Sequence, residues 1–195
     1  MDAFFISTGI VALAEMGDKT QLLALLLAAR FRQPWPIVWG ILVATLANHA
    51  LAGSLGAWLT TFMGPSALRW VLGVSFLAMA VWMLVPDKLD DGEADVAPMF
   101  GVFGTTVIAF FLAEMGDKTQ IATVMLAAEY PAWLWVVAGT TLGMMLANAP
   151  VVWFGERITQ RVPLVWVHRI SAAVFVVLGV LVLLGDDAHH LQALV

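Results

Sequence analysis

An acidic octapeptide that occurs twice carries the side chains in this chain that are best suited to chemistry. The residues AEMGDKTQ appear in the first half of the chain and again 99 positions later. Each copy places a glutamate three residues before an aspartate, as Glu15 and Asp18 and then as Glu114 and Asp117. Residues three apart lie on one face of an α-helix, so each copy predicts a pair of neighbouring carboxylates. If the two copies meet, four carboxylates surround one point, and such a cluster is typical of a cation site.

Amide side chains in and near the two copies extend the same chemistry. Gln21 and Gln120 lie two turns beyond the glutamates, and Asn48 and Asn148 follow on the next apolar segment of each half. Their carbonyl oxygens could add to the carboxylates as metal ligands. For Asn48 and Asn148, a plain hydrogen bond between helices is an equal alternative. All of these ligands are hard oxygen atoms, and the chain has no cysteine. The set therefore favours Mn²⁺, Ca²⁺ or Mg²⁺ over copper or zinc.

Each copy also contains a lysine and a glycine. Lys19 and Lys118 balance part of the acidic charge, so that four carboxylates and two lysines leave a net charge of −2. One divalent cation or two protons would neutralise this charge, which predicts exchange of one metal ion for two protons. Gly17 and Gly116 permit either close approach of two helices or local unwinding of one helix.

A simpler interpretation of the charged residues is a pair of internal ion pairs. Glu15 and Lys19 are four residues apart in the favourable order, as are Glu114 and Lys118. Such pairs would only pack helices together. This interpretation leaves both aspartates without a role and does not explain the repetition, so the lysines are expected to balance the charge of the site.

Three other polar residues are expected to have structural roles. Thr20 and Thr119 are expected to bond to the backbone, and a role as metal ligands is the alternative. His49 stands in an apolar segment, and its counterpart in the second half is Ala149. A proton relay at His49 is the alternative to a core residue whose hydrogen bonds are satisfied, and the core residue is preferred.

Composition places the two copies inside a membrane. Hydrophobic residues make up 62% of the 195 residues and charged residues 12%, whereas a soluble domain has about half apolar and about a quarter charged residues. The mean hydropathy is +0.92. A charge near the middle of a span costs a few kcal/mol, about 3 on insertion scales, so the glutamates need a partner or a function. Six apolar runs are long enough to span a bilayer: Phe4–Ala29, Trp35–Phe62, Ala67–Val85, Met99–Ala128, Ala132–Phe154 and Val162–Leu184.

The repetition extends from the octapeptide to the whole chain. The triplet LAN at 46–48 returns at 146–148, and Phe76 corresponds to Phe175. Each half holds three predicted spans, and an odd number of spans inverts the second half in the membrane. The sequence therefore predicts an all-α membrane protein of six transmembrane helices, arranged as two inverted three-helix repeats with a binding site between them near the midplane. The parts are the repeat 1–86, the acidic linker 87–98 and the repeat 99–195.

Charged residues predict the orientation of the chain and exclude one class of partner. The loops after the first, third and fifth spans hold most of the basic residues, and the opposite side has only Arg69. The positive-inside rule therefore places these loops in the cytoplasm, the acidic linker among them, and both termini outside. The net charge is −5 with no basic patch, which excludes nucleic acid as a partner. The basic residues of the three loops are Arg30, Arg32, Lys88, Arg157 and Arg161, with Arg169 just inside the sixth span.

The two copies of Glu-Met-Gly-Asp-Lys-Thr resemble the Glu-x-Gly-Asp-(Lys/Arg)-(Thr/Ser) signature of a family of cation/proton exchangers. This family includes the Golgi manganese and calcium transporters of eukaryotes and the MneA-like manganese exporters of bacteria. The resemblance covers nearly the whole chain. It implies export of Mn²⁺ from the cytoplasm driven by protons, with Glu15, Asp18, Glu114 and Asp117 at the metal. The chain lacks the long N-terminal extension of the Golgi members, so it looks like a form from the bacterial plasma membrane.

The expected function is thus secondary transport of Mn²⁺ out of the cytoplasm in exchange for protons. No permanently bound cofactor is expected, since Mn²⁺ or Ca²⁺ is the substrate. The expected partners are the lipid bilayer, a divalent cation and protons, and a homo-oligomer stays open. A Ca²⁺/H⁺ antiporter is one alternative, because oxygen ligands suit both metals, and a divalent-cation channel is another, because inverted repeats do not exclude one. An enzyme is disfavoured, because no nucleophile–base pair accompanies the carboxylates.

Overall fold

The computed structural model describes residues 1–85, 100–155 and 164–192, with the backbone alone for Leu164 and 186–192. These residues form eight helices and no strand, so the predicted all-α class is confirmed for the described part of the chain. The predicted acidic linker 87–98 lies outside the described residues, as do Lys88, Arg157 and Arg161. The helices are α1 (Asp2–Glu15), α2 (Lys19–Phe31), α3 (Pro34–Phe62), α4 (Pro65–Trp82), α6 (Gly101–Glu114), α7 (Lys118–Glu129), α8 (Trp133–Phe154) and α10 (Leu164–Gln192).

The first octapeptide interrupts a helix. α1 ends at Glu15, and α2 begins at Lys19. Between them Gly17 has a φ of 84°, in the left-handed region that only glycine adopts without strain. Asp18 then caps α2, because its carboxylate accepts a hydrogen bond from the Thr20 amide at 3.3 Å. A carboxylate at this position also interacts favourably with the positive end of the helix dipole.

The second octapeptide interrupts a helix in the same way. α6 ends at Glu114, Gly116 has a φ of 76°, and Asp117 caps α7 through the Thr119 amide at 3.4 Å. The prediction that each glutamate shares a helical face with its aspartate is therefore wrong. The physical reason is that the helix ends between the two residues, so their spacing of three no longer sets their relative direction.

Four helices are long and apolar enough to cross a membrane. They are α3, α4, α8 and the stretch Val165–Gly185 of α10, which match the second, third, fifth and sixth predicted spans. The first and fourth predicted spans are each divided into two shorter helices, α1 with α2 and α6 with α7. The structure therefore supports four spans by length and composition, and the arrangement of six spans as two inverted repeats stays a prediction.

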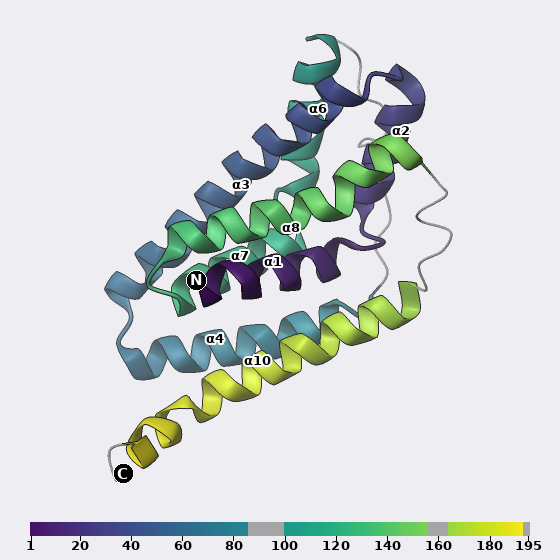
Figure 1. Ribbon diagram of the computed structural model, residues 1–195. Coiled ribbons are helices and arrows are strands. Elements are labelled where there is room, and N and C mark those ends of the chain that lie inside the picture. Colours follow the sequence, from purple (N-terminus) through teal and green to yellow (C-terminus); the bar gives the residue numbers. More distant parts are fainter. Residues whose placement is uncertain (86–99, 156–163, 193–195) are drawn as a thin grey trace.

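The helices of the two halves are interleaved. α1 packs along α8, and α6, the counterpart of α1 in the second half, packs along α3. α7 contacts α3, as α2 contacts α8. Figure 1 shows α3 and α8 running in opposite directions, with α4 and α10 side by side along one flank of the molecule. Most contacts of each half are thus made with the other half, and this interleaving brings the two octapeptides together.

Two of these crossings depend on glycine. A Cβ atom added to Gly143 of α8 would lie 2.6 Å from the carbonyl oxygen of Thr8 in α1. A Cβ atom added to Gly40 of α3 would lie 2.7 Å from the Cβ of Thr106 in α6. Both distances are too short for real atoms, so α1 and α6 approach their partners as closely as small residues allow in a membrane protein.

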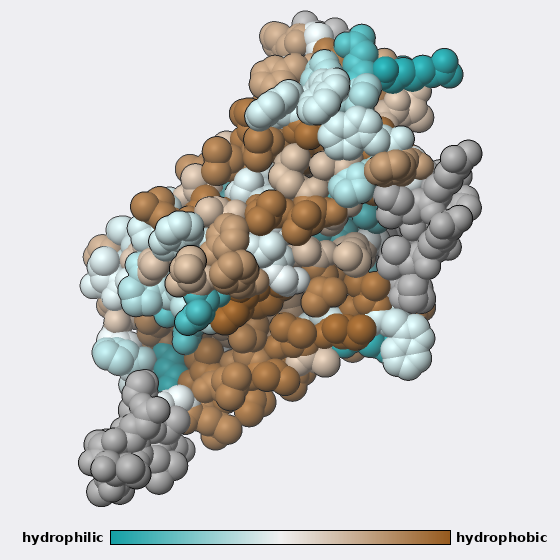
Figure 2. Space-filling model, viewed as in Figure 1, coloured by the Kyte–Doolittle hydropathy of each residue, from teal (hydrophilic) through white to brown (hydrophobic). Residues whose placement is uncertain are grey.

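Much of the outside of the described part is apolar, and the acidic residues of the two octapeptides are inside. Figure 2 shows hydrophobic side chains over the α4–α10 pair. On these helices Val74, Val81, Val177 and Leu181 are each more than half exposed. A surface of this kind needs lipid rather than water around it, and ionisable residues in such a protein face its interior. The buried polar groups between the helices are therefore the candidates for a functional site.

Candidate metal site

Carboxylates from both halves of the chain meet inside the protein. One oxygen from each of Glu15, Glu114 and Asp117 lies within 4.8 Å of the other two. The two glutamates are fully buried and Asp117 is 5% exposed. Each glutamate is the last residue of its helix, α1 or α6, so the interleaved packing that joins the ends of these helices also joins their carboxylates. Carboxylates this close repel one another strongly in a medium of low dielectric, and a cation between them would reverse that repulsion.

Asp18 has a different place from its counterpart Asp117. Both aspartates are buried and both cap a helix, but Asp18 is not one of the three carboxylates that share the cluster. The two octapeptides are identical in sequence. The difference therefore arises from the way the halves pack and not from local residues.

Three donors hold the carboxylate of Glu15. The Thr20 hydroxyl donates to Oε2 at 2.7 Å, and Asn148 Nδ2 donates to the same oxygen at 3.4 Å. The Thr119 hydroxyl of the second half donates a short hydrogen bond to Oε1. The expectation that both threonine hydroxyls bond to the backbone is therefore wrong. Each threonine lies in the first turn of its helix, where no carbonyl of that helix lies one turn earlier.

Glu114 has a contrasting environment. Neither of its carboxylate oxygens has a hydrogen-bond partner within the described part of the chain, although the side chain is fully buried. A buried carboxylate without donors carries a desolvation cost of several kcal/mol, about 3 or more. A proton or a cation bound to the carboxylate removes most of this cost. Glu114 is thus the member of the cluster whose chemistry is best suited to exchange of one for the other.

The two glutamines stabilise the helix breaks. Gln21 Oε1 accepts a hydrogen bond from the Gly17 amide at 3.1 Å, and Gln120 Oε1 accepts one from the Gly116 amide at 2.8 Å. Gln21 also reaches the other half, where its Nε2 donates to the Ala147 carbonyl at 3.0 Å. The oxygens that were predicted as metal ligands already accept hydrogen bonds from the backbone in this arrangement.

The two asparagines differ in what they offer. Asn48 joins the halves, because its Nδ2 donates to the Phe111 carbonyl at 3.0 Å and its Oδ1 accepts from Gln120 Nε2 at 3.4 Å. Asn148 donates to Glu15, and its Oδ1 has no partner among the residues that the structure describes. Asn148 therefore presents an unused carbonyl oxygen next to a carboxylate of the cluster.

The two lysines also differ. Lys118 is buried, with 3% of its surface exposed, and its Nζ donates to the Val85 carbonyl at 2.9 Å. Lys19 is half-buried. The helix breaks lie between each lysine and the glutamate four residues before it, so the helical geometry on which the simple ion-pair interpretation rests does not apply.

His49 has an environment that the sequence does not predict. It is fully buried on α3, and neither ring nitrogen has a hydrogen-bond partner in the described ranges. The expectation of a core residue with satisfied hydrogen bonds is therefore wrong. One turn earlier on the same helix, the buried Thr45 hydroxyl is likewise without a partner there. The helix that carries Asn48 thus has unsatisfied polar groups on its buried face.

Replacing Thr119 with valine is expected to weaken metal binding by about tenfold. The substitution keeps the shape of the side chain and removes the hydrogen bond from the second half to Glu15. A hydrogen bond to a charged group contributes about 1.5–3 kcal/mol, and 1.4 kcal/mol is a factor of ten. The control is Thr123→Val, one turn further along α7, whose buried hydroxyl donates to the Thr119 carbonyl at 2.8 Å. Equilibrium Mn²⁺ binding by the purified variants measures the difference, and equal affinities would contradict the role of Thr119.

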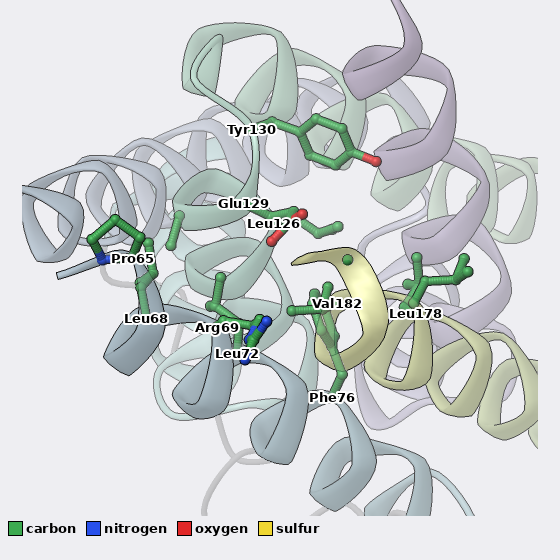
Figure 3. Close-up of a pocket in the computed structure, with 13 residues that line it drawn as sticks. Pro65, Leu68, Arg69, Leu72, Phe76, Leu126, Glu129, Tyr130, Leu178 and Val182 are labelled. Carbon is green, nitrogen blue, oxygen red and sulfur yellow. The ribbon is translucent and has the colours of Figure 1, made fainter. Parts of the chain in front are cut away.

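A cavity of about 380 Å³ lies between α4, α7 and α10, away from the cluster. Figure 3 shows Arg69, Glu129 and Tyr130 around the same space as the apolar side chains of Leu72 and Phe76. Burial raises the pKa of the Glu129 carboxyl above its usual value. The pKa of the Tyr130 hydroxyl is also raised, by burial first and then by the nearby acidic groups. The cavity therefore has a polar rim and an apolar floor.

Comparison with known proteins identifies a family. The family described as "Divalent cation/proton antiporter GDT1" matches the chain twice, at residues 3–91 and at residues 102–190. The two matched segments are 99 positions apart, the same offset that separates the two octapeptides. Together they cover most of the chain.

Individual relatives agree with this match. A Vibrio cholerae protein named "Putative manganese exporter" is 53% identical over 180 residues, which is 92% of this chain and 89% of that protein. A GDT1-like protein of Synechocystis is 27% identical over 92% of this chain and 96% of its own length. The Saccharomyces cerevisiae protein named "Divalent cation/proton antiporter GDT1" is 20% identical over 93% of this chain and 83% of its own. No solved structure matches the chain.

Proposed function

This chain belongs to the GDT1 family of divalent cation/proton antiporters, and on that premise we propose that it exports Mn²⁺ from the cytoplasm in exchange for protons. The resemblance drawn from the two octapeptides is confirmed by the family match. Members of the family are transporters and not enzymes, and the apolar helices make this chain a multi-pass membrane protein. The choice of Mn²⁺ as substrate is supported by the name of the Vibrio cholerae relative and by the oxygen ligands of the cluster.

The observation that carries the proposal is the meeting of three buried carboxylates from the two halves. In the proposed mechanism Glu15, Glu114 and Asp117 bind the metal, and the side-chain carbonyl oxygen of Asn148 is a fourth ligand. Asp18 would take the place of Asp117 when the two halves exchange roles during the cycle. Gln21, Gln120 and Asn48 keep the helix breaks and the contact between the halves in place. Lys19 and Lys118 reduce the net negative charge.

Exchange with protons follows from the cost of an empty site. Without a metal, the carboxylates of the cluster repel one another and Glu114 has no donor among the described residues. Protons would remove both penalties, and so would one divalent cation, but the two cannot occupy the same oxygens together. Release of the metal on one side of the membrane is therefore favoured when protons can replace it. This competition couples the two fluxes without any separate proton pathway.

The proposed architecture is that of six spans in two inverted repeats. α1 with α2 and α6 with α7 would each form one broken span, so that residues 1–86 and 99–195 hold three spans each. Broken helices near the midplane are the usual place of the ion site in secondary transporters. Both termini would lie outside and the linker 87–98 in the cytoplasm of a bacterial cell.

Purified protein in liposomes tests the exchange directly. When Mn²⁺ is added outside, its uptake should expel protons and make the lumen alkaline, with about two protons for each ion on the charge argument. No imposed pH gradient should be needed to start this flux, whereas an imposed acidic lumen should drive Mn²⁺ uptake against its own gradient. Uptake of Mn²⁺ with an unchanged lumen pH would contradict exchange with protons. Mn²⁺ flux that never runs against its own concentration gradient would favour a channel. Competition by Ca²⁺ in the same assay decides which metal is preferred.

A further inference from the structure

One pair of helices departs from the correspondence between the two halves. A shift of 99 positions converts α1, α2, α3 and α4 into α6, α7, α8 and α10. The contact of α1 with α8 then has its counterpart in that of α6 with α3, and the contact of α7 with α3 in that of α2 with α8. α4 contacts α7, however, and α10 contacts α1, and in the described residues neither the α10–α2 nor the α4–α6 counterpart has a comparable contact. Figure 1 shows the α4–α10 pair on the side of α1 and α7.

The two hydrophobic cores have the same asymmetry. Phe76 and Met79 of α4, and Met83 directly after it, pack in one core with Met125 and Leu126 of α7. That core also holds residues of α1 and α10, whereas α2, α3 and α6 share a separate core. The α4–α10 pair therefore packs beside α1 and α7. The equivalent position beside α6 and α2 is not taken by this pair.

The lysine of the second octapeptide fastens one end of α4 in this position. Lys118 is the first residue of α7, and its ammonium group donates to the Val85 carbonyl, three residues beyond the end of α4. The Val85 amide donates to the Trp82 carbonyl at 3.0 Å, so the chain turns directly after α4 and Val85 stays next to the end of that helix. Lys118 is 3% exposed and lies one residue from Asp117 of the acidic cluster.

The other end of α4 is separated from α7 by the cavity. Leu68 and Leu72, in the first two turns of α4, line it together with Leu126 and Glu129 at the end of α7 (Figure 3). Val182 and Gly185 of α10 line it as well. α4 is therefore closed against α7 at the Val85 end and open at the Pro65 end.

We infer that Lys118 is a positioning residue which, through the Val85 carbonyl, holds α4 closed over one side of the acidic cluster while the cavity is open at the other end of α4. The inference rests on the proposed function, because only a transporter needs its site closed toward one side of the membrane and open toward the other. Breaking the contact would free the end of α4 and allow the α4–α10 pair to move toward α2 and α6.

The shift of 99 positions predicts a matching contact in the opposite arrangement. Lys19 corresponds to Lys118, and Leu184 of α10 corresponds to Val85. In the present arrangement Leu184 is exposed, and it follows Val182 at the open end of the cavity. When α10 packs against α2, Lys19 would donate to the carbonyl of Leu184, since a carbonyl oxygen within a helix has a second lone pair. The two lysines would thus hold the two arrangements in turn.

Thiol labelling tests this inference, because the natural chain has no cysteine. Leu68→Cys places a reporter in the cavity, and Ser66→Cys places a control on the exposed surface nearby. A membrane-impermeant maleimide is applied to each face of membrane vesicles in separate reactions. Adding Lys118→Met is expected to slow labelling of Leu68→Cys at least fivefold, because the α4–α10 pair leaves this arrangement and the cavity closes. Lys118→Arg, which keeps donors, should restore most of the rate, and Lys19→Met should leave it at least as high as in the parent.

Two further measurements keep the test decisive. Labelling of Ser66→Cys in each background reports the amount of inserted protein. Met83→Ala removes apolar contacts at the same end of α4 without changing a lysine. Met83→Ala should therefore also slow labelling of Leu68→Cys. Equal labelling of Leu68→Cys in the parent, Lys118→Met and Met83→Ala proteins would overturn the inference. A purely charge-balancing role would predict the same effect for Lys118→Met and Lys19→Met, and no effect of Met83→Ala. Mn²⁺ binding by the parent is measured in parallel, and its absence would remove the proposed function while the labelling still decides the role of Lys118.

Discussion

Replacing Glu114 with glutamine is expected to abolish Mn²⁺ transport and, at the same time, to stabilise the metal-free protein. Glu114 is fully buried, and its oxygens have no hydrogen-bond partner in the described part of the chain. Glutamine has nearly the same shape and no charge, so it removes most of the desolvation cost of about 3 kcal/mol or more that the buried carboxylate carries. The substitution also removes one of the three carboxylates of the cluster. Losing a charged ligand from a buried ion costs about 3 kcal/mol or more, which corresponds to a fall of about 100-fold in affinity.

Thermal unfolding of the solubilised protein separates these two effects. The midpoint without metal should rise in Glu114→Gln, and the increase that Mn²⁺ gives to the parent should vanish. Glu129→Gln is the control, since it makes the same change at an exposed glutamate that lines the cavity away from the cluster, and it should keep the response to Mn²⁺. A Glu114→Gln protein that is still stabilised by Mn²⁺ would show that the metal binds elsewhere.

Replacing Gly116 or Gly17 with alanine is expected to reduce metal affinity by about 30- to 100-fold. Both glycines have a positive φ, of 76° and 84°, which costs an alanine about 1–2 kcal/mol. Alanine also favours a continuous helix over a broken one by about 1 kcal/mol relative to glycine. The two terms together shift the balance by about 2–3 kcal/mol toward an unbroken helix, in which Asp117 no longer caps α7 and the carboxylates of Glu114 and Asp117 leave the positions that they have in the cluster.

Gly64→Ala provides the control for this prediction. Gly64 lies between α3 and α4 with a negative φ of −66°, and a Cβ atom there would have no neighbour within 4 Å. Its replacement should leave Mn²⁺ binding and thermal stability unchanged. If Gly116→Ala binds Mn²⁺ as tightly as Gly64→Ala does, the helix break is not required for the site. Circular dichroism of the same proteins checks that the helical content has not fallen.

Much of the helical organisation could be predicted because it depends on long apolar runs. The predicted run Trp35–Phe62 matches α3 (Pro34–Phe62), and Ala132–Phe154 matches α8 (Trp133–Phe154), since prolines and tryptophans mark the boundaries. The meeting of the glutamates could be anticipated from the repeated octapeptide, and the structure places the carboxylates of Glu15 and Glu114 in one cluster. In both cases a regular pattern in the sequence corresponds to a regular feature of the structure.

The helix breaks and the asymmetry of the site could not be predicted in the same way. The sequence leaves two options open at Gly17 and Gly116, close approach of two helices or local unwinding of one helix. Hydrophobicity does not decide between them, because an apolar run resumes after each polar octapeptide. The bonds from Gln21 and Gln120 to the glycine amides exist only once the helix is broken. The unequal surroundings of Glu15 and Glu114 have a different origin, because the octapeptides are identical and only the packing of the α4–α10 pair and its neighbours can distinguish them.

The broken helices also bear on how long an ion can stay in the protein. At each break the carbonyl end of one helix, α1 or α6, faces the amide end of the next, α2 or α7, and these ends carry opposite partial charges. The carbonyl ends add to the attraction that the carboxylates exert on a cation, and the amide ends oppose it. An ion that must cross the membrane has to leave its site as readily as it entered. A small movement of the halves that changes which helix end is nearer to the ion would therefore change how tightly the ion is held.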